Sequence, residues 1–414
     1  MINSCSDNPS VRISVGEFQL GEEDRKAILE VVDSNRISEW KKTADFERKW
    51  ARFVGTKYCV AVNSGTSALI TGLLSLRNLK EKPFGEGTKV ITSPITYIAT
   101  SNALVTSGYK PAYVDIDPDT FCITPENIRA HMEAVRDPSD YSVILPVHVM
   151  GYVCDMDAIN KIAKDYGMVT FEDAAQAHGS EYKGRKAGSL SLLSDFSFYI
   201  AHNIQAGELG ALNTNDYEIA RLARKIKANG RLCDCPICTR RTKGCPKIKS
   251  LSGDDDDVDP RFSHDIIGYN FKTMEFQTAI ASVQLRRIEA IINKRQKNVK
   301  YLNEGLHRFS DVLQLPKYDE HVSYLAYPMV IKDTKKISRR KLREYLEKRG
   351  IESRPLFGCI PTQQPAYNHL KSKYSGRLPM AEYLGSNGFY IGCHQYLEEK
   401  ELDYIIDVFG ELLG

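Results

Sequence analysis

Short apolar segments alternate with amphipathic ones through the first half of the chain, and this alternation constrains the fold more than any other feature. The segments YCVAV, KVITSP and YSVILPV are apolar enough for buried strands, whereas ALITGLLSL and MDAINKIAKDYG have apolar residues at helical spacing. Strands that alternate with helices form a mainly parallel sheet with both faces covered, which is the α/β class. Functional side chains are then expected beyond the carboxyl ends of the strands.

The second half of the chain is more helical and predicts a further unit. Residues 217–230 have a helical pattern, and residues 275–306 predict one long helix that leads into a strand near Tyr324 and two more helices. At 414 residues the chain exceeds one ordinary domain. We therefore predict a large domain over residues 1–296, with an insertion at about 231–262, and a smaller C-terminal α+β domain over residues 297–414.

Composition limits the partners that the chain is expected to have. A formal net charge of +3 predicts neither a nucleic-acid partner nor an anionic membrane surface. The N-terminal residues have no basic start followed by an apolar run, and the chain has no apolar stretch of about 18 residues. We expect a cytoplasmic protein.

The turn NSGTS, residues 63–67, joins an expected strand to an expected helix. Small residues at such a turn let backbone N–H groups and the helix N-terminus face an anion, usually a phosphate. Many turns of this kind carry Ser or Thr only as a helix cap, so both interpretations stay open for the motif alone.

The segment FEDAAQAHG brings Glu172, Asp173, Gln176 and His178 to the end of a buried strand. A buried carboxylate is costly unless it has a partner. A protonated pyridine nitrogen is one such partner, which would make Asp173 the electron-sink partner of a pyridoxal-type cofactor. The alternative is that Asp173 caps the next helix.

Four motifs occur in the order known from one family. NSGTSAL, EDAAQAHG, DFSFYIAHN with GELGA, and GYNFKTMEFQTAIASVQL resemble the signature of the DegT/DnrJ/EryC1/StrS sugar aminotransferases, from about Val15 to the C-terminus. The resemblance implies fold-type I, the aspartate aminotransferase-like fold of pyridoxal-phosphate enzymes, with the large domain binding the cofactor. It implies these cofactor contacts: Gly65, Thr66, Ser67 and Ser197 at the phosphate, Tyr97 stacked on the ring, Asp173 at the ring nitrogen, and Gln176 near the ring hydroxyl. Asn270 would reach the phosphate of a neighbouring subunit, which implies a homodimer.

The resemblance places the family's cofactor-anchoring lysine at position 202, where this chain has His202. An imidazole cannot hold the cofactor aldehyde covalently, but it can move protons near neutral pH. The replacement resembles the 3-dehydratase branch of the family. That branch implies pyridoxamine 5′-phosphate, a nucleotide-linked 4-keto-6-deoxyhexose that loses its C3 hydroxyl group, and His202 as the base. An aminotransferase-like enzyme for another hydroxylated ketone, and a catalytically silent cofactor-binding regulator, are the alternatives.

Four of the ten cysteines crowd into one segment, with the spacing C-x-C-x₂-C-x₆-C: Cys233, Cys235, Cys238 and Cys245. Four thiolates suit an iron–sulfur cluster or zinc. The spacing resembles the CDP-4-keto-6-deoxyglucose 3-dehydrase type, although its last interval is about one residue shorter than in that enzyme. The resemblance implies a [2Fe–2S] cluster and an electron-donating reductase as partner. The alternative is the colitose type, without electron transfer and with zinc on the cysteines.

Near the C-terminus, GIESRPLFGCIPTQQPAY resembles the substrate-side segment of the histidine-type dehydratases. Arg354 is then a candidate contact to the phosphates of the sugar nucleotide, although a surface arginine beside a proline explains it equally well. His148 and His394 are candidate neighbours of the active site with weaker support. The run Asp254–Asp257 predicts a solvated loop, or a contact to a basic redox partner.

Overall fold

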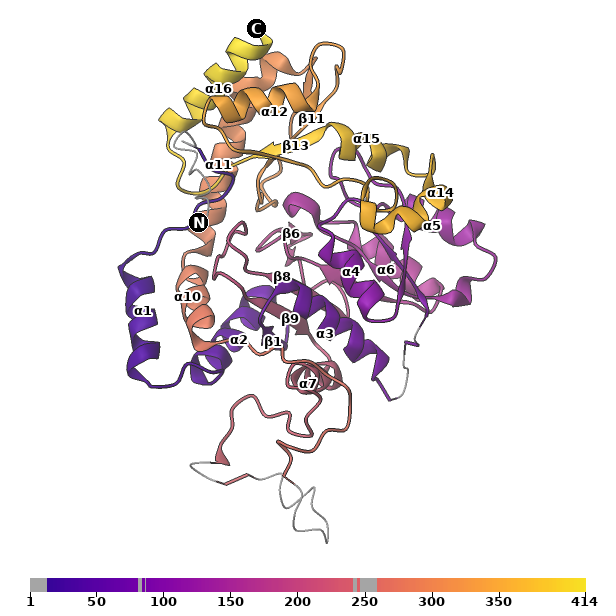
Figure 1. Ribbon diagram of the computed structural model, residues 1–414, viewed down its shortest axis with the longest axis vertical. Coiled ribbons are helices and arrows are strands. Elements are labelled where there is room, and N and C mark those ends of the chain that lie inside the picture. Colours follow the sequence, from indigo (N-terminus) through magenta and orange to yellow (C-terminus); the bar gives the residue numbers. More distant parts are fainter. Residues whose placement is uncertain (1–12, 81–83, 86, 241–243, 246–258) are drawn as a thin grey trace, which may run out of the picture.

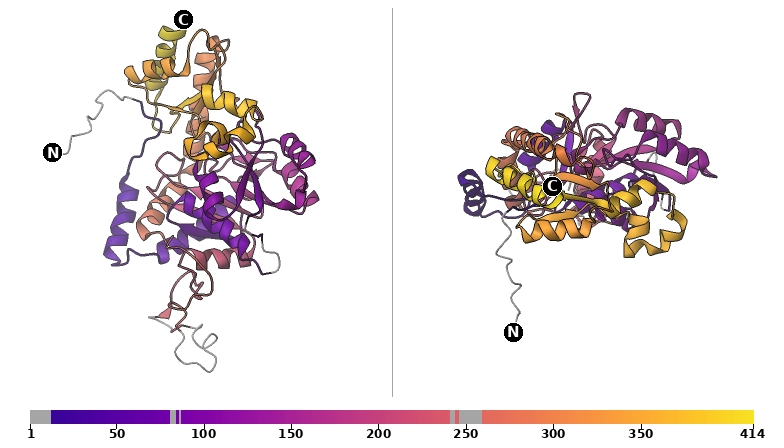
Figure 2. Two further views of the ribbon diagram at one scale, coloured as in Figure 1. Left: turned by 45° about the vertical axis from the view of Figure 1, so that its right-hand side comes forward. Right: turned by 90° about the horizontal axis from the view of Figure 1, so that it is seen from above.

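The computed structural model describes residues 13–80, 84–85, 87–240, 244–245 and 259–414, so the run Asp254–Asp257 lies outside the described residues. Figure 1 shows a central α/β body, with the C-terminal segment at one end. At the other end the chain leaves this body after α7 and returns before α10, in the views of both Figure 1 and Figure 2. No helix in the described ranges is both long and apolar enough to cross a membrane.

The central sheet has seven strands in the order β1-β9-β8-β5-β4-β2-β3. All neighbouring strands from β8 to β3 pair in parallel, whereas β9 is antiparallel to both β1 and β8. The mainly parallel sheet predicted from the alternating pattern is confirmed. The strands are β1 (Tyr58–Val62), β2 (Lys89–Thr92), β3 (Lys110–Tyr113), β4 (Tyr141–Leu145), β5 (Val169–Asp173), β8 (Leu193–Ser197) and β9 (Gly210–Thr214).

Helices cover this sheet on both sides, and side chains at their first residues explain where several begin. The side chains of Thr124, Asp155 and Asp216 accept backbone hydrogen bonds at the starts of α5, α6 and α7, which satisfies N–H groups that lack a helical partner. Helix α3 packs on β8 and β9, and α2 packs on β1. The helices of this part are α1 (Glu22–Asp33), α2 (Lys41–Val54), α3 (Gly65–Arg77), α4 (Ala99–Thr106), α5 (Pro125–Ala134), α6 (Met156–Asp165), α7 (Tyr217–Ile226) and α10 (Glu275–Leu285).

The C-terminal part is built on a four-stranded antiparallel sheet in the order β10-β11-β13-β12. Helix α11 (Ile288–Leu306) packs against α16 (Glu399–Leu413), and α12 (Arg339–Lys348) packs on β12. The predicted domain boundary between residues 296 and 297 falls inside α11 and stays a prediction. The remaining elements are β6 (Glu181–Tyr182), β7 (Arg185–Lys186), β10 (Leu313–Gln314), β11 (Tyr327–Ile331), β12 (Ser353–Pro355), β13 (Gly388–Ile391), α13 (Ile360–Gln363), α14 (Lys371–Tyr374) and α15 (Pro379–Asn387), with short 3₁₀ turns η1 (Pro138–Asp140), η2 (Val149–Gly151), η3 (His307–Phe309) and η4 (Pro365–Leu370).

The single long helix expected over residues 275–306 is wrong, because the chain forms two helices, α10 and α11, with a break at Arg286 and Arg287. The backbone N–H groups of these two arginines donate to the carbonyls three residues before them, which tightens the turn. Both guanidinium groups reach Glu23 at the start of α1, at 3.0 Å and 2.9 Å. The apolar pattern continues through the break, and for this reason the sequence did not reveal it.

Candidate active site

Three segments meet at the N-terminus of α3: the turn before that helix, the end of β8 and the start of β9. Ser64 Oγ accepts a hydrogen bond from Ser67 N at 3.1 Å and caps the helix. A Cβ atom at Gly65 would lie 2.6 Å from Ser197 Cβ, and one at Gly210 would lie 2.1 Å from Ser64 O, so only glycine fits at these positions. The first turn keeps N–H groups without helical partners beside the hydroxyl groups. Such a helix end is a ready site for a phosphate.

The structure therefore brings together four of the residues that were predicted to contact a phosphate: Gly65, Thr66, Ser67 and Ser197. Their assignment to a phosphate stays a prediction.

Asp173 lies at the same sheet edge as this helix end. It is the last residue of β5 and pairs in register with Asp195 of β8, two residues before Ser197. A strand rises about 3.3 Å per residue, so Ser197 lies about 7 Å beyond Asp195 along β8. The Asp173 carboxylate is buried, and Thr100 Oγ1 donates to its Oδ2 at 2.7 Å. Burial raises the pKa of Asp173, and the hydrogen bond from Thr100 lowers it in part.

These two features fit a pyridoxal-type cofactor. Within the described ranges, no lysine or arginine forms an ion pair with Asp173. A buried carboxylate without a cation needs a positively charged or hydrogen-bonding partner, and a protonated pyridine nitrogen supplies both. A ligand with a phosphate at one end and such a ring at the other suits both places.

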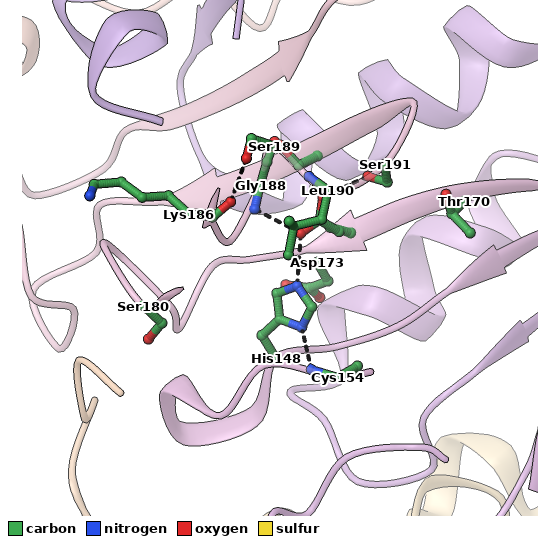
Figure 3. A network of polar contacts seen from close by, with 12 residues as sticks. His148, Cys154, Thr170, Asp173, Ser180, Lys186, Gly188, Ser189, Leu190 and Ser191 are labelled. Carbon is green, nitrogen blue, oxygen red and sulfur yellow. Dashed lines mark hydrogen bonds and ion pairs between the residues drawn. The ribbon is translucent and has the colours of Figure 1, made fainter. Parts of the chain in front are cut away.

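A second buried carboxylate, Glu172, lies next to Asp173 on β5 and fixes the segments around it through four hydrogen bonds. Glu172 accepts hydrogen bonds from His148 Nε2 at 2.9 Å, Gly188 N at 2.7 Å, Leu190 N at 2.8 Å and Ser191 Oγ at 2.8 Å. Figure 3 shows His148 between Cys154 and the turn at residues 188–191.

His148 Nδ1 accepts from Cys154 N at 3.3 Å, so the neutral ring carries its proton on Nε2, toward Glu172. His148, a weak candidate from the sequence, is therefore fully buried and acts as part of this support.

His202 lies in a loop whose two ends are fixed on the sheet. Ser197 and Gly210 pair in register, and Phe198 N donates to Leu209 O at 2.8 Å. His202 Nδ1 lies 3.3 Å from Tyr199 O, and its ring stacks on that of His178 with the centroids 5.9 Å apart.

Burial lowers the pKa of His202 to about 4, so the imidazole is neutral at neutral pH. When Nδ1–H donates to Tyr199 O, Nε2 keeps a free lone pair that can accept a proton.

Two other predicted residues lie on opposite sides of this region. Gln176 is buried, and its Oε1 accepts from Met150 N at 2.9 Å. Tyr97 is 62% exposed and lines a cavity of about 630 Å³ between the start of α4 and the C-terminal part of the chain. Across this cavity lies Phe357, whose ring centroid is 6.4 Å from that of Tyr97.

Arg354 and His394 have local partners. Arg354 forms an ion pair with Glu352 at 2.8 Å, and it is not among the described residues that line the cavity, although residues 355–358 are. His394 is buried, with its Nε2 3.5 Å from Ser14 Oγ. Neither contact shows a substrate role for these residues.

The cysteine segment follows α7, where the chain leaves the central body in Figure 1, whereas Asn270 precedes Phe271, whose carbonyl accepts from Asn63 N at 2.8 Å beside the turn before α3. Cys238 is exposed, and the other three thiols of the segment are partly exposed. In the part of the chain that the structure describes, no three His, Cys, Asp or Glu side chains gather as a metal site. Asn270 is exposed and accepts from Lys272 Nζ at 2.5 Å.

Sequence patterns missed Thr100. It lies on α4, far from Asp173 in the chain, and nothing in YIATSNA distinguishes it from an ordinary helical hydroxyl. Only the placement of α4 beside the end of β5 brings the two side chains together.

Comparisons with known proteins show the family and the fold of the chain. Residues 19–409 match the model of the DegT/DnrJ/EryC1/StrS aminotransferase family. The chain is 31% identical to dTDP-4-dehydro-2,6-dideoxy-D-glucose 3-dehydratase of Saccharopolyspora spinosa, over 95% of this chain and 85% of the relative. It is also 31% identical to GDP-perosamine synthase of Caulobacter vibrioides, over 99% of this chain and 100% of the relative.

Among solved structures, that of Escherichia coli GDP-4-keto-6-deoxy-D-mannose-3-dehydratase with bound hydrated PLP superposes with a TM-score of 0.84. It shares 27% identity and covers 96% of this chain and 99% of that protein.

Proposed function

The chain belongs to the DegT/DnrJ/EryC1/StrS aminotransferase family, and from this premise we propose that it is a pyridoxamine-phosphate-dependent 3-dehydratase of a nucleotide-linked 4-keto-6-deoxyhexose. The observation that carries the proposal is His202, at the position that the resemblance gives to the anchoring lysine. Relatives named as 3-dehydratases support it.

The residues of the site suit the parts that this function requires. Bound pyridoxamine phosphate supplies an amine that joins the substrate ketone and a ring that takes up electron density. Gly65, Thr66 and Ser197 would hold the phosphate, and Asp173 would keep the proton on the ring nitrogen. His202 would accept a proton at Nε2, because its lowered pKa leaves the ring neutral.

The proposal is tested by supplying the protein with pyridoxamine phosphate and nucleotide-linked 4-keto-6-deoxyhexoses. Mass spectrometry should detect a product that lacks the C3 oxygen. His202→Asn should lower the rate by about 10²- to 10⁴-fold, the usual contribution of general acid–base catalysis. His307→Asn, which changes an exposed histidine, is the matched control.

His202→Lys separates this function from that of an aminotransferase. The lysine should bind pyridoxal phosphate covalently, with a change in its visible absorbance, and dehydration should stop. If dehydration persisted in this variant, His202 would not be the base. A wild-type protein that leaves every ketosugar nucleotide unchanged would favour the regulator.

We further propose that the four-cysteine segment holds a [2Fe–2S] cluster that receives electrons from a reductase. The support is the spacing of Cys233, Cys235, Cys238 and Cys245. In the described part of the chain, the thiols do not gather into a metal site. Anaerobic purification followed by iron, sulfide and zinc analysis tests this point. Stoichiometric zinc in a colourless protein would favour the colitose type.

We also propose a homodimer in which Asn270 completes the neighbouring site. Apolar side chains are exposed on the segment that carries Asn270: Phe262, Ile267, Tyr269 and Met274. Light scattering should give twice the mass of the chain. Asn270→Ala should then weaken cofactor binding without changing that mass.

A further inference from the structure

We propose that Thr100 and Thr96 are positioning residues, whose hydroxyl groups form a chain that keeps Asp173 ionised and directs its carboxylate at the cofactor ring nitrogen. The inference rests on the proposed function for the identity of the cofactor. The chain of hydroxyl groups itself is a property of the protein alone.

The geometry fixes the direction in which these hydroxyl groups donate their hydrogen bonds. Thr100 Oγ1 lies 2.7 Å from Asp173 Oδ2, and Thr96 Oγ1 lies 2.9 Å from Thr100 Oγ1. An ionised carboxylate only accepts hydrogen bonds, so Thr100 must donate to Asp173 and its oxygen is left to accept from Thr96. All three side chains are buried, so the bonds lie in a low-dielectric region where each is strengthened by the next.

The other charged or titratable groups near Asp173 do not replace these hydroxyls. His148, from the end of β4, lowers the pKa of Asp173 only weakly, and its side chain is directed to Glu172. Asp195, on the neighbouring strand β8, is buried, and burial together with the negative charge of Asp173 raises its pKa well above the usual range, so it offers Asp173 no compensating positive charge. Among the described residues, the other donor to the Asp173 carboxylate is Ala175 N, at 3.3 Å. Thr100 thus provides the shorter of two hydrogen bonds.

Thr96, the outer of the two hydroxyl-bearing residues, borders a space large enough for a ligand. Thr96 lines the cavity of about 630 Å³ beside Tyr97. A molecule that binds there and contacts Thr96 would therefore act on Asp173 through two hydroxyl groups. Thr100 lies in the first turn of α4, and Thr96 lies in the bend that precedes this helix.

The test compares four variants with the wild type. Thr100→Val removes the inner hydroxyl at nearly constant shape, Thr100→Ser retains it, and Thr96→Val removes only the outer one. Thr71→Val is the matched control, because Thr71 is fully buried and its hydroxyl has no partner among the described residues.

The first readout uses the protein without cofactor. Ionisation of Asp173 becomes more costly when Thr100 no longer donates, so Thr100→Val should lose more stability at pH 7 than at pH 4. The pKa of Asp173 should rise by about one to two pH units, the equivalent of one hydrogen bond to a charged group. Thr96→Val should cause a smaller rise, and Thr100→Ser should resemble the wild type. The penalty of Thr71→Val should be independent of pH.

The second readout is the pH dependence of pyridoxamine-phosphate affinity, with the ¹⁵N shift of the ring nitrogen as a spectroscopic marker. The pH below which affinity falls should move up by the same amount in Thr100→Val. If Thr100→Val and Thr71→Val gave equal pH profiles in both readouts, the proposal would be overturned. Should Thr100→Val not fold, equal profiles for Thr96→Val and the wild type would overturn it. A wild-type protein that does not bind pyridoxamine phosphate would instead refute the proposed function, and the first readout would still decide the role of the hydroxyls.

Discussion

Replacing Glu172 by glutamine should destabilise the protein by an amount that follows from its four donors. One carboxylate oxygen accepts from His148 Nε2 and Gly188 N, and the other accepts from Leu190 N and Ser191 Oγ. A glutamine side chain must put its NH₂ group at one of these two oxygen positions. At either position the NH₂ group, itself a donor, would face two donors.

The NH₂ group destabilises the protein less when it takes the oxygen position that faces Leu190 N and Ser191 Oγ. The single hydroxyl proton of Ser191 lies within reach of both Glu172 Oε1, at 2.8 Å, and Leu193 O, at 2.7 Å, so in the variant it can go to Leu193 O while the oxygen accepts from the new NH₂ group. Leu190 N then loses its acceptor. The loss of this one hydrogen bond to a charged group, which leaves the buried Leu190 N–H without a partner, costs about 1–3 kcal/mol.

Urea unfolding followed by circular dichroism measures this loss. Glu181→Gln is the matched control, since Glu181 belongs to the same region and forms a partly exposed ion pair with Lys186, worth less than about 1 kcal/mol. The double variant Glu172→Gln/Ser191→Ala should lose about 1 kcal/mol more than the sum of the two single changes, because Ser191 provides the relief. A loss below about 1 kcal/mol for Glu172→Gln would refute the reasoning.

Two further predictions concern Gly210, beside the turn before α3, and the histidines His202 and His394. Gly210→Ala should lower pyridoxamine-phosphate affinity at least about tenfold and reduce the melting temperature, because the new methyl group would meet the backbone of Ser64. Gly85→Ala, whose Cβ would lie 4.0 Å from the nearest atom, is the control, and equal affinities in titrations would contradict the argument. Burial lowers the pKa of His202 and of His394 to about 4, so the unfolded chain binds more protons than the folded one below about pH 6.5, and stability should fall from pH 7 to pH 4. His394→Asn should make the pH dependence of the unfolding free energy shallower, and an unchanged slope would show that His394 titrates normally in the folded protein.

The sequence predicted those parts of the fold and site that depend on local pattern. The alternation of apolar and amphipathic segments predicted the parallel sheet, because both kinds of element must bury an apolar face. The short turn before α3 predicted an anion site, because the glycine and its hydroxyl-bearing neighbours are adjacent in the chain.

Features that depend on strand order were not accessible in this way. Thr100 and Asp173 come together because β2, which precedes α4, lies two positions from β5 in the sheet. The antiparallel insertion of β9 between β1 and β8 likewise leaves no local signal. The break at Arg286 was missed because the apolar pattern continues through it.

The loop that carries His202 has a consequence for how such proteins diversify. Its ends are held by the Ser197–Gly210 pair, and Phe198 N and Leu209 O bond directly beyond that pair. Residues between these points can change without disturbing strand register, because both strands are already aligned below them. A lineage with this architecture could therefore exchange one reaction type for another through substitutions inside the loop. Selection in the laboratory could explore the same route by randomising residues 199–202, 207 and 208, which are exposed or partly exposed, and keeping the buried residues 203–206.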